Sequence, residues 1–147
     1  MKIGLIFGTR PEAIKMAPVY HELKEFFDVK VIVTGQHKEM LYQILNIFEI
    51  KPDYELNLMK KGQELSELTS RMITSLDQIF KVEKFDYILV QGDTTSAFTG
   101  ALVAFYNKVP VAHIEAGLRT GNIYSPFPEE ANRKLIGVVT KLHFAPT

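Results

Sequence analysis

The sequence contains no cysteine, and this absence removes several kinds of chemistry at once. Disulfide bonds, zinc sites built on thiolates and cysteine nucleophiles are all excluded. A chain without cysteine is also compatible with a reducing compartment. We therefore expect a cytoplasmic protein whose chemistry, if it has any, relies on acids, bases and cations.

Long hydrophobic runs are missing as well. The longest mostly apolar stretch, Ala97 to Tyr106, is far short of the roughly 20 residues that a membrane-spanning helix needs. The first twelve residues have neither the length nor the cleavage region of a signal peptide. These absences predict no association with a membrane.

Neither sign of charge is in excess, because 17 lysines and arginines balance 17 aspartates and glutamates. A nucleic-acid-binding protein usually has a basic excess or stripe, so we expect no nucleic acid as a partner. Hydrophobic residues make up 46% of the 147 residues, which is enough for a core of ordinary size. With no repeat or linker, residues 1–147 are predicted to form a single domain.

Apolar strand patterns alternate with amphipathic helix patterns along the chain. Such alternation predicts an α/β fold, a Rossmann-like and mostly parallel sheet with right-handed crossovers and helices on both faces. Pro18 should kink or interrupt the first helix. The expected strands cover residues 2–7, 29–34, 54–59, 87–90, 109–114 and 142–145, and the expected helices cover 9–26, 38–48, 65–80, 94–106 and 129–140.

Glycine and polar residues recur where the predicted strands end. Segments of this kind are Gly8–Arg10, Gly35–His37, Gly92–Thr95 and Glu115–Arg119. Ligands of open parallel sheets bind beyond the carboxyl ends of the strands, so these segments should converge on one site. Their convergence is a stronger signal than any single motif.

The segment Gly8–Glu12 joins a glycine turn to a helix start that matches the capping-box pattern. Free backbone N–H groups at such a start favour an anion, and Arg10 adds donors suited to phosphate. The alternative is an exposed turn arginine on a capped helix. Neither the dinucleotide fingerprint nor the phosphate-binding P-loop motif is present, so neither NAD nor ATP is indicated.

Several acids are candidates for proton transfer. Asp93 and Glu115 follow strands that should be neighbours, where one carboxylate could raise the pKa of the other and keep it protonated. Asp93 could instead cap the following helix. Glu129 and Glu130 begin a helix, where acids often simply complement the helix dipole.

Histidines carry less signal than the acids. His113 lies in a buried strand, and we interpret it as a hydrogen-bonded core residue. His37 could be an ordinary turn residue. No spacing of histidines and acids indicates a metal site, and no Gly-x-Ser-x-Gly elbow indicates a serine hydrolase.

Several motifs in order along the chain resemble the non-hydrolysing UDP-N-acetylglucosamine 2-epimerases. They lie at residues 7–18 (FGTRPEAIKMAP), 53–57 (DYELN), 92–95 (GDTT), 113–121 (HIEAGLRTG) and 124–130 (YSPFPEE). The resemblance implies that UDP-N-acetylglucosamine and its mannosamine epimer are interconverted. UDP is eliminated, a bound 2-acetamidoglucal forms, and UDP adds back after the C2 proton is replaced on the other face. No cofactor or catalytic metal is implied.

The resemblance also implies roles for individual residues. Arg10 and Lys15 would lie near the diphosphate or the sugar, and Asp93, Glu115 and Glu129 would be the candidate acids and bases. Some bacterial members of the family bind a second UDP-N-acetylglucosamine as an activator. The corresponding positions here are Gln36 and His37.

The family enzyme has two Rossmann-like domains in a glycosyltransferase-B-like arrangement, with the active site between them. This chain resembles only the N-terminal domain, so we expect it to need the C-terminal domain and to be nearly inactive alone. A homodimer is a further expectation. Two alternatives remain open: half of a glycosyltransferase, or a UDP-sugar-binding or regulatory module without chemistry.

Overall fold

The computed structural model describes residues 1–35, 38–58 and 60–146. Six strands and five helices alternate along these residues. The strands are β1 (Lys2–Phe7), β2 (Asp28–Val33), β3 (Tyr54–Glu55), β4 (Tyr87–Gln91), β5 (Val111–Ile114) and β6 (Thr140–Phe144). The helices are α1 (Arg10–Leu23), α2 (Lys38–Ile47), α3 (Leu65–Val82), α4 (Thr95–Tyr106) and α5 (Glu129–Val139).

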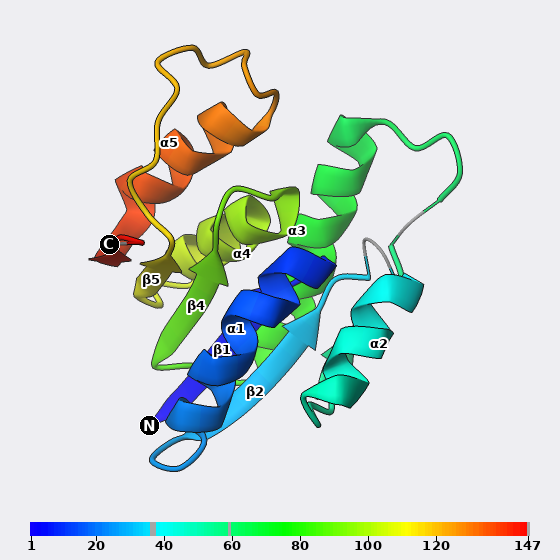
Figure 1. Ribbon diagram of the computed structural model, residues 1–147, viewed down its shortest axis with the longest axis vertical. Helices are drawn as coiled ribbons and strands as arrows, with labels where there is room; N and C mark the ends of the chain where they lie inside the picture. Colours follow the sequence, from blue (N-terminus) through cyan, green and yellow to red (C-terminus); the bar gives the residue numbers. More distant parts are fainter. Residues whose placement is uncertain (36–37, 59, 147) are drawn as a thin grey trace.

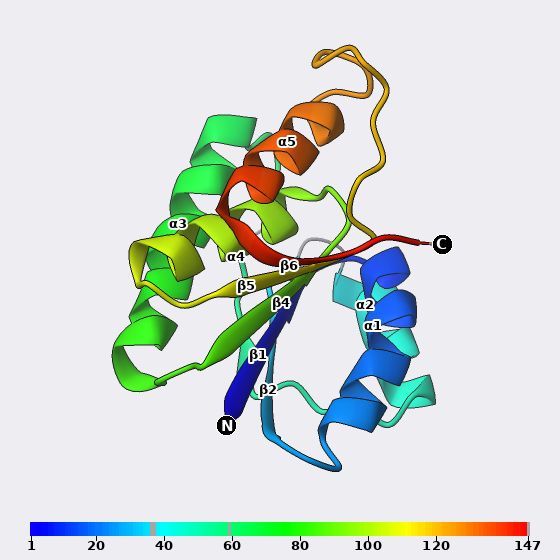
Figure 2. The same ribbon diagram turned by 90° about the vertical axis from the view of Figure 1, so that its left-hand side faces the viewer.

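The strands form one sheet in the order β3-β2-β1-β4-β5-β6, and every pair of neighbours is parallel. Helices α1 and α2 cover one face, and α3, α4 and α5 cover the other (Figures 1 and 2). The predicted Rossmann-like α/β sheet is therefore confirmed. The chain proceeds outward in one direction from β1 to β3 and in the other from β4 to β6, so the strand order reverses between β1 and β4.

Two hydrophobic clusters fill the space between the sheet and its helices. One cluster packs α1 and α2 against the sheet through side chains such as Leu5, Met16 and Leu41, all fully buried. The other packs α3, α4 and α5 through side chains such as Leu76 and Ile136. Because the central strands β1 and β4 are covered on both faces, they are apolar runs rather than alternating ones.

Helix α1 runs through Pro18 without interruption, so the predicted interruption is wrong, while a kink at Pro18 stays a prediction. Proline lacks the N–H that would bond to the carbonyl of Ile14. Both Pro18 and Ile14 lie on the exposed side of α1, where water can satisfy that carbonyl. The helix also ends at Leu23, three residues before the predicted end.

The boundaries of the last strands differ slightly from the predicted ones. Strand β5 begins at Val111 rather than Val109, because Pro110 has no N–H for the sheet and only its carbonyl bonds, to the N–H of Ile88. Strand β6 follows α5 directly at Thr140, with an irregularity that leaves Lys141 out of register. The edge strand β3 is only two residues long.

Candidate active site

The loops that follow β1, β4 and β5 meet at the carboxyl edge of the sheet. Strands β1 and β4 are the neighbours between which the strand order reverses, and β5 is next to β4. A crevice opens at such a reversal in an open parallel sheet. The three predicted segments Gly8–Arg10, Gly92–Thr95 and Glu115–Arg119 are therefore brought together, as their position after strands indicated.

The first two backbone N–H groups that follow β1 are already occupied. The carboxylate of Glu12 accepts hydrogen bonds from the N–H of Gly8 at 3.1 Å and from the N–H of Thr9 at 2.9 Å. The expectation of free N–H groups at this turn is therefore wrong for Gly8 and Thr9. The capping box that the sequence predicted is the reason, because its glutamate fills the position that a bound anion would take.

Arg10 is the exposed cation of the same turn. It has no hydrogen-bond or ion-pair partner among the described residues, and it stands at the first position of α1. A guanidinium in this place is available to bind a phosphate from solution. With the neighbouring N–H groups occupied, Arg10 is the group after β1 best able to bind an anion.

Arg133 of α5 joins Asp93 and Glu115. Its Nε donates to Asp93 Oδ2 at 3.1 Å, and one terminal nitrogen donates to Glu115 Oε1 at 3.0 Å. Its other terminal nitrogen donates to the backbone carbonyl of Glu115. The Arg133 side chain is only 6% exposed. The two carboxylates thus share a buried cation, and all the hydrogen-bonding nitrogens of Arg133 are used.

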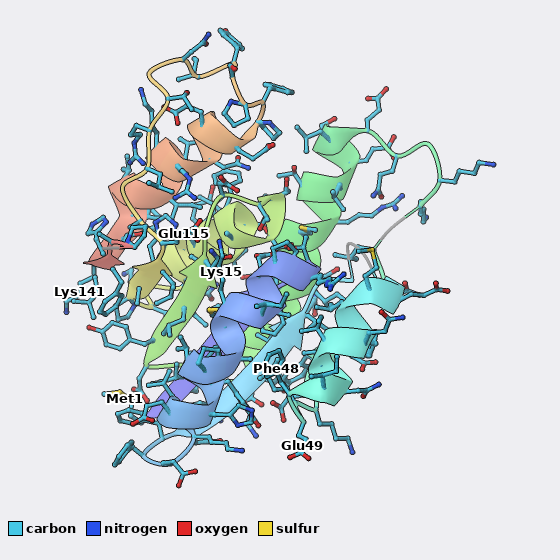
Figure 3. The ribbon with its side chains drawn as sticks, viewed as in Figure 1. Met1, Lys15, Phe48, Glu49, Glu115 and Lys141 are labelled. Atoms are coloured by element: carbon cyan, nitrogen blue, oxygen red, sulfur yellow. The ribbon has the colours of Figure 1, made fainter. Side chains whose placement is uncertain are left out.

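Lys15 lies on the other side of Glu115. Its ammonium group forms an ion pair with Glu115 Oε2, as the approach of the two labelled side chains in Figure 3 illustrates. Lys15 projects from α1 and Arg133 from α5, so Glu115 connects the two faces of the sheet. Glu115 is one-fifth exposed, and Lys15 is about half exposed at 49%.

The charge state of Glu115 follows from these neighbours. Partial burial acts to raise its pKa, but the ammonium of Lys15 and the guanidinium of Arg133 outweigh burial and lower the pKa below its usual value. The prediction that one carboxylate remains protonated is therefore wrong for Glu115. A cation separates it from Asp93, so mutual repulsion is not the dominant effect.

The backbone of Glu115 is strained. Its φ angle is 64°, in the left-handed region that residues other than glycine seldom adopt. Hydrogen bonds from Arg133 to both the side chain and the carbonyl of Glu115 hold it there. Strain that the surroundings maintain in this way is typical of functional positions.

Asp93 does not cap α4, which was the structural alternative for this residue. Thr94 is the N-cap, and its hydroxyl accepts the N–H of Ala97 at 3.0 Å. The carbonyl of Asp93 accepts a hydrogen bond from the side chain of Asn132 at 2.9 Å. Helix α5 therefore positions both the backbone and the carboxylate of Asp93.

The two glutamates that begin α5 differ in their surroundings. Glu130 is buried, and its carboxylate accepts the N–H of Thr120 at 3.0 Å and the N–H of Gly121 at 3.2 Å. It thereby holds the loop between β5 and α5, which projects beyond the sheet in Figures 1 and 2. Glu129 is half-buried and has no side-chain hydrogen bond among the described residues. Its carboxylate is free to act on a ligand.

A small pocket of about 180 Å³ opens beside the shared arginine. Its walls come from the end of β4, the loop after β5 and the start of α5. The lining residues are Asp93, Leu118, Arg119, Thr120, Pro126, Glu130 and Arg133. The pocket places two acids, Asp93 and Glu130, and two arginines around one space, which suits a strongly polar ligand.

His113 is a core residue, as the sequence indicated. It is buried, and its Nε2–H donates to the carbonyl of Gly92 at 2.7 Å. Burial lowers its pKa. Gln36 and His37 lie outside the described residues. Among the described residues, no group of three or more histidines and acids could hold a metal ion.

Arg133 and Asn132 are the residues that sequence reasoning missed. Both precede the buried Ile136 on the inner side of α5, by three and four residues. Polar side chains on the buried side of a helix must find partners, and these two find Asp93 and Glu115. That periodicity is the signal that could have identified them.

Comparison with known proteins agrees with this geometry. A family model described as UDP-N-acetylglucosamine 2-epimerase matches residues 21–147. The chain belongs to this family. A UDP-N-acetylglucosamine 2-epimerase of Bacillus subtilis strain 168 is 56% identical over 149 residues, which cover 100% of this chain and 39% of that protein.

Solved structures of the family share the fold. The Neisseria meningitidis UDP-GlcNAc 2-epimerase bound to UDP-GlcNAc has a TM-score of 0.96 at 57% identity, covering 100% of this chain and 40% of that one. The Methanocaldococcus jannaschii enzyme in complex with UDP-GlcNAc and UDP has a TM-score of 0.93 at 37% identity, covering 100% and 41%. The chain thus spans about 40% of the length of these relatives and corresponds to their N-terminal part.

No helix among the described residues is long and apolar enough to cross a membrane.

Proposed function

We propose that this chain forms the N-terminal half of the active site of a non-hydrolysing UDP-N-acetylglucosamine 2-epimerase. The observation that carries the proposal is the arrangement around Arg133, which holds Asp93 and Glu115 together where the strand order reverses. Arg10, a cation without a partner among the described residues, begins the helix after the adjacent strand β1. Family relatives with this fold have been solved with UDP-GlcNAc and UDP.

The reaction that we propose moves one proton and one leaving group. A base removes the proton from C2 of the sugar, and the electrons of that C–H bond form a C1–C2 double bond. The C1–O bond breaks, and its electron pair leaves with the oxygen of UDP. In the return step a proton adds to C2 from the opposite face and UDP adds back at C1, so no oxidant or reductant is needed.

Each candidate side chain has a charge suited to a part of this reaction. Arg10 would bind the diphosphate and stabilise the negative charge that develops as it leaves. Glu115, whose pKa is lowered, would be ionised at neutral pH and is suited to accept a proton or to stabilise positive charge at the sugar. Asp93 and Glu129 are the other candidates for proton transfer, and Lys15 would orient Glu115 beside the sugar.

The binding partners follow from the same proposal. UDP-N-acetylglucosamine or UDP would lie across the carboxyl edge of the sheet, and a C-terminal domain would close over it. A homodimer, a cytoplasmic location and a regulatory role for Gln36 and His37 remain predictions.

The test is proton NMR of UDP-N-acetylglucosamine in D₂O. The chain would be measured alone and also joined to the remainder of the Bacillus subtilis relative, a fusion called here the completed protein. We expect the mannosamine epimer, with deuterium at C2, only in the presence of the completed protein. A folded completed protein without exchange would refute the proposal, and binding of the nucleotide sugar without exchange would favour a binding module.

A further inference from the structure

Glu12 links two loops that are distant in sequence. Its side chain is almost completely buried, at 1% exposed. Oxygen Oε1 accepts from the N–H groups of Gly8 and Thr9 and from the Thr9 hydroxyl at 2.8 Å. Oxygen Oε2 accepts from the hydroxyl of Thr94 at 2.9 Å, and Thr94 is 82 residues further along the chain.

The second oxygen distinguishes Glu12 from an ordinary capping residue. A capping-box glutamate needs only one oxygen for its own helix, and it normally lies at the surface. Burial of a carboxylate is costly unless hydrogen bonds compensate for it. In Glu12 that compensation comes from both loops, and the bond from Thr94 is possible because β1 and β4 are neighbours.

The link crosses the point where the strand order reverses. On one side, Glu12 holds the turn that carries Arg10 and begins the helix that carries Lys15. On the other side, Thr94 follows Asp93 directly and caps α4 with the same hydroxyl group that binds Glu12. One carboxylate therefore connects the helix that carries the cations to the loop that carries the acid.

We propose that Glu12 is a positioning residue, which sets the place of Arg10 and Lys15 relative to Asp93 through its hydrogen bond with Thr94. This inference rests on the proposed function for its effect on turnover. Glu12 is too deeply buried to touch the substrate. Its role is to hold the side chains that follow β1 at a fixed distance from those that follow β4 when a ligand binds between them.

The experiment compares three variants of the completed protein. Glu12→Gln keeps the size of the side chain but replaces one of its two accepting oxygens by an NH₂ group, which cannot accept a hydrogen bond. Thr94→Val removes the hydroxyl group. Thr94→Ser keeps the hydroxyl and is the matched control. Each variant is assayed for kcat, for KM and for the Tm of unfolding, so that loss of positioning is separated from loss of folded protein.

We expect Glu12→Gln and Thr94→Val to lower kcat by about 10- to 100-fold, since small displacements of reacting groups have effects of that size. KM should change less, and Thr94→Ser should stay within about twofold of the wild type, because a retained hydroxyl keeps the hydrogen bond. The two changes combined should lower kcat no more than the larger one alone, because residues that act as a unit are not additive. Wild-type kcat in folded Glu12→Gln and Thr94→Val would overturn the inference.

A second measurement is independent of turnover. In the isolated chain, labelled with nitrogen-15, Thr94→Val should shift the backbone signals of Gly8, Thr9 and Arg10, whereas Thr94→Ser should leave them in place. Unchanged signals after β1 would show that the two loops are not coupled and would refute the inference. If the wild-type completed protein showed no epimerisation, the proposed function would fail, and this measurement would still decide whether Glu12 couples the loops.

Discussion

A cluster of charged side chains lies at each edge of the sheet, and the two clusters differ in how their members are paired. At the amino edge, Lys2 and Glu83 form an ion pair at 2.6 Å, and the hydroxyl of Tyr54, which belongs to the edge strand β3, reaches the same carboxylate and donates to it at 2.6 Å. At the carboxyl edge, Asp93 and Glu115 share Arg133, while Arg10 and Glu129 have no side-chain partner among the described residues.

The difference indicates which edge is structural and which is functional. The cluster of Lys2, Tyr54 and Glu83 satisfies its own members and joins three elements of the fold. The groups at the carboxyl edge have exposed atoms, a strained backbone at Glu115 and a pocket of about 180 Å³ beside them. A pocket of about 210 Å³ also opens at the amino edge, beside Lys84 and Lys108, so free charge and space alone do not distinguish the candidate active site. The acids that share Arg133 where three loops converge distinguish it.

The largest effect that we predict is at Glu115. Glu115→Gln in the completed protein keeps the side-chain volume but removes the negative charge that pairs with Lys15 and Arg133. We expect kcat to fall by about 10²- to 10⁴-fold, the usual contribution of a group that moves a proton. Kinetic assays of epimerisation would measure it, and a change of less than about twofold in folded protein would contradict this role.

Replacement of Arg10 should have a smaller effect, mainly on binding. Arg10→Ala should raise the Kd for UDP by about 10- to 100-fold, because charged hydrogen bonds to phosphate are lost. Arg10→Lys should recover part of the affinity, since the charge remains but the planar fork does not. Calorimetric titration of the completed protein would measure both variants. The Tm should not change, because Arg10 has no partner among the described residues, and an unchanged Kd would contradict the prediction.

A third prediction concerns pH and Glu12. Burial raises the pKa of Glu12 to about 7, although its hydrogen bonds with Gly8, Thr9 and Thr94 act in the opposite direction. A raised pKa means that folded protein holds this proton more tightly than unfolded protein. The stability that this proton contributes is therefore complete below the ordinary pKa of 4.5 and is lost as the pH rises to about 7.

Glu12→Gln removes this titration and provides the comparison. The free energy of unfolding of the wild type, relative to Glu12→Gln, should fall by about 3 kcal/mol over that pH range, at 1.36 kcal/mol for each pKa unit. Denaturant titrations of the isolated chain at several pH values would measure it. A constant difference between the two proteins would contradict the prediction.

The smallest effect on activity is expected at the amino edge. Glu83→Gln should lower the Tm by a few degrees, because the carboxylate that pairs with Lys2 and Tyr54 is lost, yet kcat should be unchanged. Hydrogen bonding to Lys2 and then to Tyr54 lowers the pKa of Glu83, so its contribution to stability is present above its ordinary pKa and is lost as the pH falls below it. Thermal melts and kinetic assays of one preparation would test this. A loss of kcat would show that the amino-edge cluster also affects activity, and it would contradict the structural role given to that cluster.

Most of the fold could be predicted from the sequence, because strand and helix periods are local properties. Glycine turns after apolar runs located the ends of β1 and β4, and the motif at residues 113–121 located the end of β5. Pro18 was misjudged because its effect depends on whether the carbonyl that it leaves unpaired faces water. Strand β5 starts at Val111 rather than at the predicted Val109, because Pro110 has no N–H to donate to a neighbouring strand.

The candidate site was harder to predict than the fold, because it depends on contacts between distant residues. The sequence identified Asp93 and Glu115 as neighbours but not Arg133, which lies 40 and 18 residues further on and changes their charge balance. It identified Glu12 as part of a cap but not its bond to Thr94. Hydrogen bonds between loops depend on strand order, which no local pattern records.

The most direct test of the account is a UDP titration of the isolated chain labelled with nitrogen-15. We predict that saturable shifts will appear at Arg10, at Gly92–Thr94 and at Glu115–Gly121, while Lys2 and Glu83 stay unchanged. Saturable shifts confined to the amino edge, or none at the carboxyl edge at millimolar UDP, would contradict the assignment of the functional site.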